Sequence, residues 1–380
     1  MQVIPRKLKQ QRELDHLSQY AAISLKSRGR QTEETDCRIR TPFERDVGRI
    51  LYSVDFRRLR QKTQVFFNPR NDHICTRMEH VLYVNYIAST IGKALNLNTD
   101  LIEAIALGHD IGHTPFGHTG EKELQACLEK YNADFSFQHE LHSLRVVDVL
   151  AQRKPNQNGL NLTFEVRDGI VSHCGEKYNE YELKPNREKT ESELIPGAQK
   201  HEPPATLEGC VVRMADKIAY IGRDIEDGAR AGLMSFDALP IAIKTELGTT
   251  NGEIINTLVK DIIDNSYGHD AVIMSQEKGQ AMEELLNNNM RHIYRSDRIQ
   301  RYDFTVRNIV RGLFEIFLEY GVKPKQLAKE SEYNMMFRNF KEYLEKHPET
   351  KASTIRKVTD YIAGMTDHFA QTCFNQIFQV

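Results

Sequence analysis

Two histidines and two aspartates of this chain are candidate metal ligands, because their side chains commonly bind metals and their surroundings in the sequence are suitable. His109 and Asp110 are adjacent, His80 lies upstream and Asp216 lies far downstream. Two imidazoles and two carboxylates suit a first-row divalent cation such as Mn²⁺, Fe²⁺, Ni²⁺ or Zn²⁺, whereas all-oxygen sets suit Mg²⁺ better. Such a cation polarises a phosphoryl oxygen and holds or activates water. The four residues together predict a divalent metal site of a hydrolase, with the metal open among Mn, Mg, Fe, Ni and Zn.

His80 shares a helical spacing with apolar residues. Val84, Ile87, Ile91 and Leu95 follow it at intervals of three or four. Residues so spaced lie on one face of a helix, and an apolar face is buried. We therefore expect His80 to point into the core. A core histidine held by a hydrogen bond is the alternative, and for a lone histidine it is the commoner situation.

The pair His109-Asp110 falls where a helix should end. We expect this helix to begin at Thr99 as its N-cap and to stop before Pro115, which cannot continue it. Glycines on either side of the pair favour fraying there. At such a turn, neighbouring side chains can converge on one point.

Asp216 lies among apolar residues of a predicted helix. Val212, Ala219 and Arg223 fall on its face. A carboxylate between apolar neighbours costs several kcal/mol, on the order of 2–7, unless it is paired or metal-bound. A salt bridge from Arg223 or Lys217 is the alternative to metal binding.

Helical periodicity dominates the chain, so we predict an all-α fold, a helical bundle with additional C-terminal helices. Residues 1–40 are polar and predict an N-terminal arm. Residues 41–232 carry the chemistry and form the expected core, in which 176–205 is a long polar loop that we expect to be mobile. Residues 233–380 predict a C-terminal helical region, a scaffold or an oligomerisation surface.

Composition and charge limit the classes of protein to which this chain can belong. The chain has 380 residues and a net charge of −2, so no global basic field points to nucleic acid. Six scattered cysteines without C-x-x-C favour a reduced, cytoplasmic protein. The N-terminus has no apolar signal region, and no apolar run approaches the length of a membrane span.

Several blocks in order resemble one family. They are RTPFERDVGRILYSVDFRRLRQKTQVF, TRMEH, HDIGHTPFGHTGE, FQHELHSLRVV, LTFEVRDGIVSH and ADKIAYIGRDIEDG, spread between about residues 20 and 232. The chain resembles the HD superfamily and, within it, the deoxynucleoside triphosphate triphosphohydrolases, the dGTPase-like branch. The resemblance implies hydrolysis of a dNTP to a deoxynucleoside and inorganic triphosphate. It also implies a homo-oligomer, with a hexamer favoured, and a dNTP as a candidate activator.

The resemblance assigns roles to single residues. The four residues above correspond to the family's metal ligands, while His118, Glu121 and His139 correspond to its catalytic residues. His118 and Glu121 are three apart across a helix start, so they face each other. A carboxylate beside an imidazole favours the protonated ring, which suits a general acid. The alternative for His118 is a helix N-terminal residue without a role. His113 matches a variable position.

Six further residues resemble substrate ligands: Gln64, Val65, Arg77, Lys217, Tyr220 and Asp224. For each of these residues, the alternative to substrate binding is a structural role at the surface or in the core.

Arg77 and Lys217 resemble phosphate ligands, because a triphosphate needs cations. Tyr220 and Asp224 resemble groups that stack on and hydrogen-bond the sugar. Gln64 resembles a reader of the 3′-hydroxyl, and its neighbour Val65 could exclude a 2′-hydroxyl by its bulk.

The chain departs from the family pattern at three positions in two blocks. Many bacterial members have amides where this chain has Glu140 and His142. Many also have a second aspartate where this chain has Lys217. The lysine resembles that of the animal enzymes of the family and strengthens the phosphate interpretation. No residue reads out a base preference.

Two other hypotheses remain open. One is another HD phosphohydrolase: a nucleotidase or a hydrolase of guanosine tetraphosphate or cyclic dinucleotides. The other is a catalytically quiet scaffold for nucleotides or, weakly, single-stranded nucleic acid, to which the basic residues between Arg57 and Lys62 point. The KTQVF block and the His118–Glu121 pair argue against the first, and the complete ligand set argues against the second.

Overall fold

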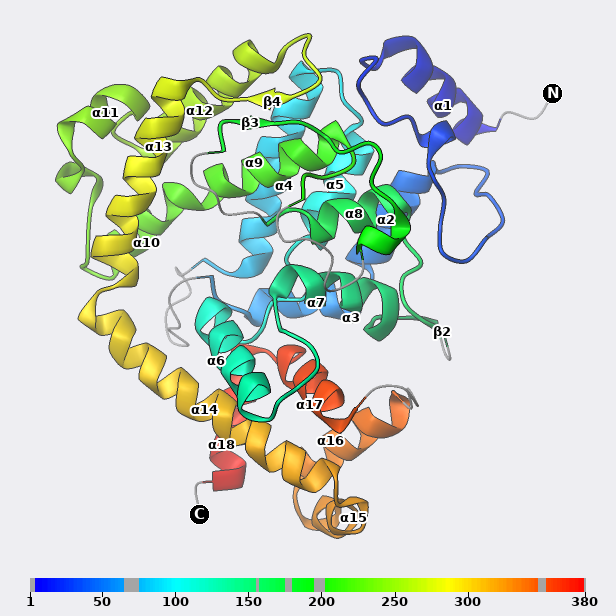
Figure 1. Cartoon of the computed structure of the whole chain (residues 1–380), viewed down its shortest axis with the longest axis vertical. Coiled ribbons are helices and arrows are strands. Elements are labelled where there is room, and N and C mark those ends of the chain that lie inside the picture. The colour runs from blue at the N-terminus through cyan, green and yellow to red at the C-terminus, as the bar shows by residue number, and fades with distance from the viewer. Residues whose placement is uncertain are drawn as a thin grey trace. The chain divides into compact units, whose positions relative to one another are not determined.

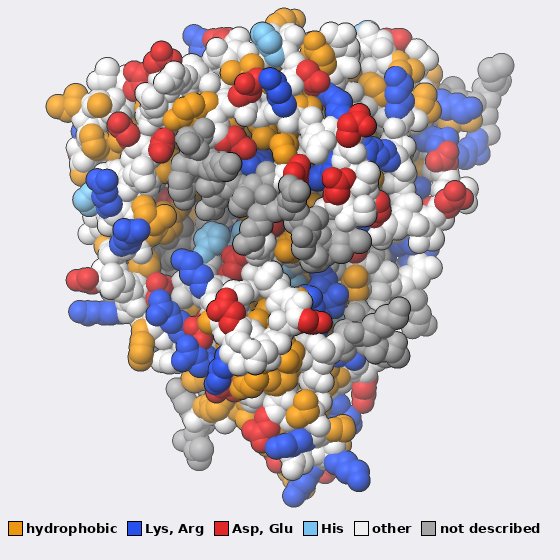
Figure 2. All heavy atoms as spheres, in the orientation of Figure 1, with side chains coloured by type: hydrophobic (Ala, Val, Ile, Leu, Met, Phe, Trp, Pro, Cys, Tyr) orange, Lys and Arg blue, Asp and Glu red, His pale blue; other side chains and the backbone are white. Residues whose placement is uncertain are grey.

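The computed structural model describes residues 4–64, 75–154, 157–174, 180–194, 202–347 and 353–378. Within these ranges helices dominate, and the strands form only two short two-stranded antiparallel sheets, which confirms the all-α prediction (Figure 1). Charges of both signs are scattered over the face drawn in Figure 2, in keeping with the near-zero net charge.

The chain divides into two compact units that are interleaved along the sequence. Unit 1 comprises residues 1–57, 78–111 and 143–296, and unit 2 comprises residues 58–77, 112–142 and 297–380. The three consecutive regions expected from sequence assume that neighbours in the chain pack together. The units instead combine stretches that are far apart in sequence.

Unit 1 contains most of the helices. Up to the first sheet its elements are α1 (Pro5–His16), η1 (Ser24–Lys26), α2 (Pro42–Leu51), α3 (Val54–Arg58), most of α4 (Arg77–Ala94), α5 (Thr99–Gly108), the end of α7 (His139–Arg145), the π-helical turn η3 (Val146–Leu150), β1 (Gln152–Lys154) and β2 (Gln157–Asn158). The later ones are α8 (Phe164–Val171), β3 (Glu182–Leu183), η4 (Glu191–Leu194), α9 (Leu207–Ile221), α10 (Arg223–Arg230), η5 (Phe236–Ala238), α11 (Ile241–Leu247), α12 (Asn251–Ser266), β4 (Val272–Ile273), α13 (Gln276–Asn289) and η6 (Met290–Tyr294).

The centre of unit 1 is the contact between α5, α8 and α9, with α2 against α5. All apolar side chains of α5 are buried. On α4, the predicted stripe of Val84, Ile87, Ile91 and Leu95 is buried too, as its spacing required. This packing fixes the helices that carry the predicted metal ligands.

The described part of the expected polar loop, residues 180–194, is tied to the rest of unit 1. Lys189 is buried, and its Nζ lies 2.8 Å from a carboxylate oxygen of Asp168 and 2.7 Å from Ser172 Oγ. Leu183 of β3 is buried as well and pairs with Val272 of β4. The expected mobility of the remaining residues falls largely on 175–179 and 195–201, outside the described residues.

Unit 2 has a separate apolar core. Its elements are η2 (Leu59–Gln61), α6 (Gly117–Lys130), the start of α7, α14 (Asp297–Gly321), α15 (Pro324–Tyr333), α16 (Met335–Lys346), α17 (Thr354–Ala363) and α18 (Asp367–Phe378). The long helix α14 contacts α6, α17 and α18 (Figure 1). Phe314, Phe317 and Phe340 are fully buried in this core. The C-terminal region therefore builds the core against which α6 packs.

Candidate metal centre and histidine cluster

Helices α4 and α9 bring His80 and Asp216 together in unit 1. His80 Nε2 lies 2.9 Å from Asp216 Oδ1. Lys217 pairs with Glu180 at 3.3 Å, and Arg223 pairs with Glu226 at 2.7 Å, so neither cation is the partner of Asp216. Burial opposes ionisation of Asp216, but the hydrogen bond from His80 outweighs it and holds the pKa of this carboxyl below its usual range.

His109 lies at the C-cap of α5 and presents one nitrogen to two carboxylates. Its Nδ1–H donates to Ala106 O at 2.7 Å, which leaves Nε2 with its lone pair. Nε2 is buried, has no hydrogen-bond partner among the described residues, and lies 3.8 Å from Asp216 Oδ1 and 3.9 Å from Asp110 Oδ1. Burial lowers the pKa of His109, so the ring is neutral. The lone pair of Nε2 and the two carboxylates repel one another, and a cation bound between them would turn this repulsion into attraction.

A third histidine, His173, joins this group. Its Nδ1–H donates to Ile170 O at 2.6 Å, the same arrangement as in His109, and the two rings lie 4.8 Å apart. Backbone anchoring of one ring nitrogen is how metal-binding histidines are usually oriented. Sequence reasoning did not single out His173, although it ends the block LTFEVRDGIVSH.

The ligand atoms form two overlapping triads within 4.8 Å of one another, His80-His109-Asp110 and His109-His173-Asp216. A first-row cation with bonds of about 2.0–2.2 Å spans ligand atoms up to about 4.4 Å apart. The mixed N/O donor set, with an orphaned imidazole nitrogen at its centre, therefore fits such an ion after small side-chain adjustments.

The local sequence explains why His109 is placed there. Helix α5 is capped by Asn98, whose side chain accepts from Leu101 N–H, and Thr99 is the first helical residue rather than the cap. Gly108 lets α8 and α2 pack close against the end of α5. A Cβ at this position would lie 2.7 Å from Ile170 Cδ1 and 3.2 Å from Ile50 Cδ1. This close packing sets the end of α5 and hence the position of His109.

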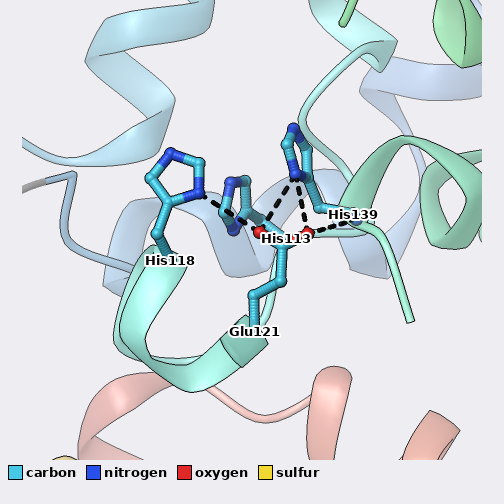
Figure 3. A group of neighbouring side chains, drawn as sticks. All are labelled: His113, His118, Glu121 and His139. Atoms are coloured by element: carbon cyan, nitrogen blue, oxygen red, sulfur yellow. Dashed lines mark hydrogen bonds and ion pairs between the residues drawn. The ribbon is translucent and has the colours of Figure 1, made fainter. Parts of the chain in front are cut away.

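Unit 2 holds a second cluster, centred on Glu121 of α6 (Figure 3). His118 Nδ1 and His139 Nδ1 each lie 3.2 Å from Glu121 carboxylate oxygens, and the backbone N–H of His139 donates to Glu121 Oε1 at 2.9 Å. The ring of His113 stacks on that of His139, with centroids 4.2 Å apart. Burial would raise the pKa of Glu121, but the three histidines outweigh it and hold the pKa well below its usual value.

This cluster can move a proton. Glu121 is largely buried, whereas the side chain of His118 is 57% exposed. With Nδ1 of His118 directed to Glu121, its Nε2 is the nitrogen left to exchange a proton with a ligand. His113 was not among the expected site residues, although its position between His109 and His118 in the block HDIGHTPFGH was visible.

The turn before α6 is held by the C-terminal region. Phe116 and Gly117 both have left-handed backbone, with φ of 63° and 59°. Phe116 is a non-glycine residue there, and such conformations persist where the surroundings enforce them. Asp367 of α18 accepts from Phe116 N–H at 2.8 Å and from Thr63 N–H at 3.0 Å. One carboxylate thus fixes the turn that carries His118 and the strand-like segment that leads to Gln64.

Two of the six expected substrate ligands lie in unit 2. Arg77 is almost fully buried, and an added Cβ at Gly117 would lie 3.2 Å from its Nη2. Gln64 is half-buried, and its Oε1 has no hydrogen-bond partner among the described residues. Val65 lies outside the described residues.

The other three lie in unit 1, on α9 and α10. Lys217 is buried with Glu180, and Tyr220 is half-buried. Asp224 is buried and accepts a hydrogen bond from Tyr294 Oη, a partner 70 residues further along the chain that no local pattern predicts. Burial raises the pKa of Asp224 to about 7.

Two of the departures from the family pattern, His142 and Glu140, have different environments. His142 is buried: its Nδ1–H donates to Gly112 O at 2.8 Å, and its Nε2 lies 3.5 Å from Asp360 Oδ1. Glu140 is partly exposed, 3.6 Å from His139 Nδ1. His142 is therefore a packing residue of unit 2, while Glu140 adds a second carboxylate beside His139.

Comparison with known proteins places these residues in a family. The HD domain family matches residues 77–221, and the phosphohydrolase-associated domain family matches residues 272–376. A deoxyguanosinetriphosphate triphosphohydrolase-like protein of Caldanaerobacter subterraneus is 40% identical over 98% of this chain and 95% of its own length. Proteins of the same description from Desulfatibacillum aliphaticivorans and Rickettsia felis are 39% and 33% identical, over 97% and 95% of this chain and 96% and 98% of their own lengths. Among the described residues, no helix combines the length and apolarity that crossing a bilayer requires.

Proposed function

Because this chain belongs to the family of HD-domain deoxyguanosinetriphosphate triphosphohydrolase-like proteins, we propose that it hydrolyses deoxynucleoside triphosphates to deoxynucleoside and inorganic triphosphate. The observation that carries this proposal is the cluster of His118 and His139 on Glu121. A metal site alone fits any HD phosphohydrolase. A buried carboxylate that holds two imidazoles adds a proton donor for an alkoxide leaving group.

The residues proposed to bind the divalent cation are His80, His109, Asp110 and Asp216, with His173 as a further ligand or a support for His109. When bound, such an ion polarises a phosphoryl oxygen and activates water. His109 keeps its Nε2 lone pair available because the backbone carbonyl of Ala106 holds Nδ1–H, whereas Nε2 of His173 lies 3.2 Å from the thiol of Cys174, which would have to turn away before His173 could bind the ion. The metal dependence of the reaction is part of the proposal.

The proton required by the leaving group comes from His118. Water forms a bond to the α-phosphorus, and the bond from that phosphorus to O5′ breaks. His118 donates the proton on Nε2 to O5′, and the water loses a proton to solvent. Nδ1–H of His118 and Nδ1–H of His139 each donate to the Glu121 carboxylate, so Glu121 acts as a group that orients both rings.

Substrate binding is assigned to the residues that match the family pattern. Arg77 and Lys217 would contact phosphates, for which Lys217 would exchange its bond to Glu180 for a phosphate oxygen. Tyr220 and Asp224 would contact the sugar. Gln64, whose buried Oε1 has no partner among the described residues, would contact the 3′-hydroxyl, and Val65 would exclude a 2′-hydroxyl.

The reaction itself is the first test. The protein is incubated with each dNTP and rNTP in Mg²⁺ or Mn²⁺, alone and with a mixture of dNTPs that would reveal activation. Inorganic triphosphate with free deoxynucleoside is expected. Orthophosphate or pyrophosphate as product would refute the proposal, and the absence of turnover under all conditions would favour a nucleotide- or single-strand-binding scaffold.

Two variants separate the roles of the clusters. Asp110→Ala should remove bound metal and activity together, measured by elemental analysis and product formation. His118→Ala should keep the metal and lose activity by about 10²–10⁴-fold. His269→Ala, at an exposed histidine outside both clusters, is the control. A near-normal rate for His118→Ala would show that the acid has been assigned to the wrong residue.

Assembly is also proposed on the resemblance, and location on the six scattered cysteines. We expect a homo-oligomer, a hexamer by preference, in the cytoplasm. Light scattering of the purified protein measures the mass of the assembly, and a monomer across micromolar concentrations would contradict this expectation.

A further inference from the structure

The turn that leads into α6, residues 112–117, is linked to the C-terminal helices α17 and α18 through three of its backbone groups. Asp367 of α18 accepts from Phe116 N–H, as described above. The other two groups are carbonyl oxygens, and the buried side chains of Lys62 and His142 donate to them. The C-terminal region is therefore hydrogen-bonded to this turn as well as packed against α6.

Lys62 joins two carbonyl groups that are far apart in the sequence. Its Nζ donates to His113 O and, at 2.8 Å, to the carbonyl oxygen of Ala363, the last residue of α17. The last carbonyls of a helix lack partners within the helix and lie at the negative end of its dipole, so a cation suits them. The main chain of Lys62 is itself fixed, because Arg77 N–H donates to Lys62 O at 2.9 Å. The side chain therefore braces the turn against the end of α17.

Packing alone does not account for a lysine at this position. Lys62 is 2% exposed, and taking an ammonium group out of water is costly unless other groups compensate its charge. The carboxyl of Asp367 contributes to that compensation: burial raises its pKa, and the positive charge of Lys62 opposes the rise. An apolar side chain would fill the same space without this cost. The ammonium is therefore explained by the two carbonyls that it holds.

His142 holds the first residue of the turn in a similar way. Its Nδ1–H donates to Gly112 O at 2.8 Å, and its Nε2 lies 3.5 Å from Asp360 Oδ1 on α17. Residues 360, 363 and 367 of the C-terminal helices are thus linked to residues 112, 113 and 116 of the turn, in the same order along both segments.

The turn in turn sets the position of His118. This residue is the second of α6 and follows directly on the left-handed residues Phe116 and Gly117. Its side chain is 57% exposed, so packing around the ring does little to fix it. A proton donor has to lie within hydrogen-bond reach of the leaving oxygen, and a displacement of about 1 Å can cost about 10²-fold in rate. The bonds that hold the turn therefore bear on the chemistry.

We propose that Lys62 is a positioning residue for the reaction proposed above, on which this inference rests: its ammonium ties the turn 112–117 to the end of α17, so that the C-terminal helices fix the place of His118. Asp367 and His142 hold the other two points of the turn. Lys62 is buried and acts through His118 rather than on the substrate.

The first test compares two neutral side chains of similar length at position 62. Lys62→Met removes the ammonium, and Lys62→Gln ends in an N–H donor that can still reach a carbonyl. We expect kcat for a dNTP to fall about 10²-fold in Lys62→Met and to recover partly in Lys62→Gln, with bound metal retained in both. KM should change by less than about threefold, because Thr63 N–H stays bonded to Asp367 and the segment that leads to Gln64 keeps its anchor.

Rates are measured well below the melting temperature of each variant, on protein whose folded fraction is checked by circular dichroism. Lys329→Met, at an exposed lysine of α15, is the matched control and should have a normal rate. If Lys62→Met does not fold, the milder Lys62→Gln carries the test, with a smaller expected loss. A normal kcat in a folded variant at position 62 overturns the proposal.

Combination with His118→Ala separates positioning from general damage to the fold. If Lys62 acts through His118, the double variant Lys62→Met/His118→Ala should be no slower than His118→Ala, because the proton donor is already absent. Losses that multiply would show that Lys62 acts independently of His118, and the proposal would be wrong.

Labelling with diethyl pyrocarbonate, measured for each histidine by mass spectrometry, does not depend on activity. His113 is 1% exposed and should be protected in the unmodified protein and in Lys329→Met, while the exposed His269 serves as the internal reference. In Lys62→Met the turn should loosen, and His113 should react severalfold faster. If the unmodified protein releases no triphosphate, the proposed function fails, and this labelling still decides whether Lys62 holds the turn. Unchanged labelling of His113 overturns that role.

Discussion

The burial of Asp224 predicts the sign and size of a pH dependence of the free energy of unfolding. Its carboxyl is 1% exposed and bonded to Tyr294, and burial raises its pKa from 3.8 to about 7. The folded protein therefore keeps a proton that the unfolded chain has already released. Between about pH 4 and pH 7 the native state binds more protons, so stability falls as pH rises and then levels off.

The pKa shift of Asp224 sets how much stability is lost. A shift of about three pKa units, at 1.36 kcal/mol each, corresponds to about 4 kcal/mol at alkaline pH. Asp224→Asn keeps the shape and an oxygen for Tyr294 Oη but cannot ionise. The unfolding free energy of the variant minus that of the unmodified protein should therefore increase with pH, by about 2 kcal/mol between pH 5 and pH 7.

The assay is urea unfolding of the metal-free protein in EDTA at intervals from pH 5 to pH 8. Metal is removed because a bound cation would change the charge balance near α9. Asp237→Asn, at an exposed aspartate, is the control and should run parallel to the unmodified protein. If the Asp224→Asn curve also runs parallel, or diverges in the opposite sense, Asp224 is ionised throughout and the reasoning from burial fails.

Three further predictions test the other parts of the site. Glu121→Gln should lower kcat by about 10²–10⁴-fold with little change in the melting temperature, and a rate within tenfold of normal would contradict its role. Gly108→Ala should destabilise the fold by about 1–3 kcal/mol because its methyl group would press on Ile170, whereas Gly252→Ala, with open space around it, should not; equal effects in urea unfolding would count against the packing argument. Mn²⁺ at a hundred times its dissociation constant should raise the unfolding free energy by about 2.7 kcal/mol and leave Asp110→Ala unchanged, so a similar gain in both would place the ion elsewhere.

Periodicity, spacing and the order of motifs were sufficient to predict the family and much of the local structure. The all-α class followed from periodicity, and the buried stripe that begins at His80 followed from spacing alone. The end of α5 at Gly108 followed from glycine and proline, with an error of one residue at its cap. The ordered blocks identified the family, which the full-length relatives bear out. Each of these signals is local, because it depends on neighbours in the chain.

Contacts between distant segments could not be predicted from the sequence. His173 reaches His109 because α8 packs on α5, a contact between stretches more than sixty residues apart that no periodicity encodes. Asp367 holds the turn at Phe116 across 251 positions, and Tyr294 meets Asp224 across 70. Lys62 likewise reaches Ala363 across 301 positions. Such pairings depend on how helices stack, and stacking is determined by the summed packing of many side chains rather than by any motif.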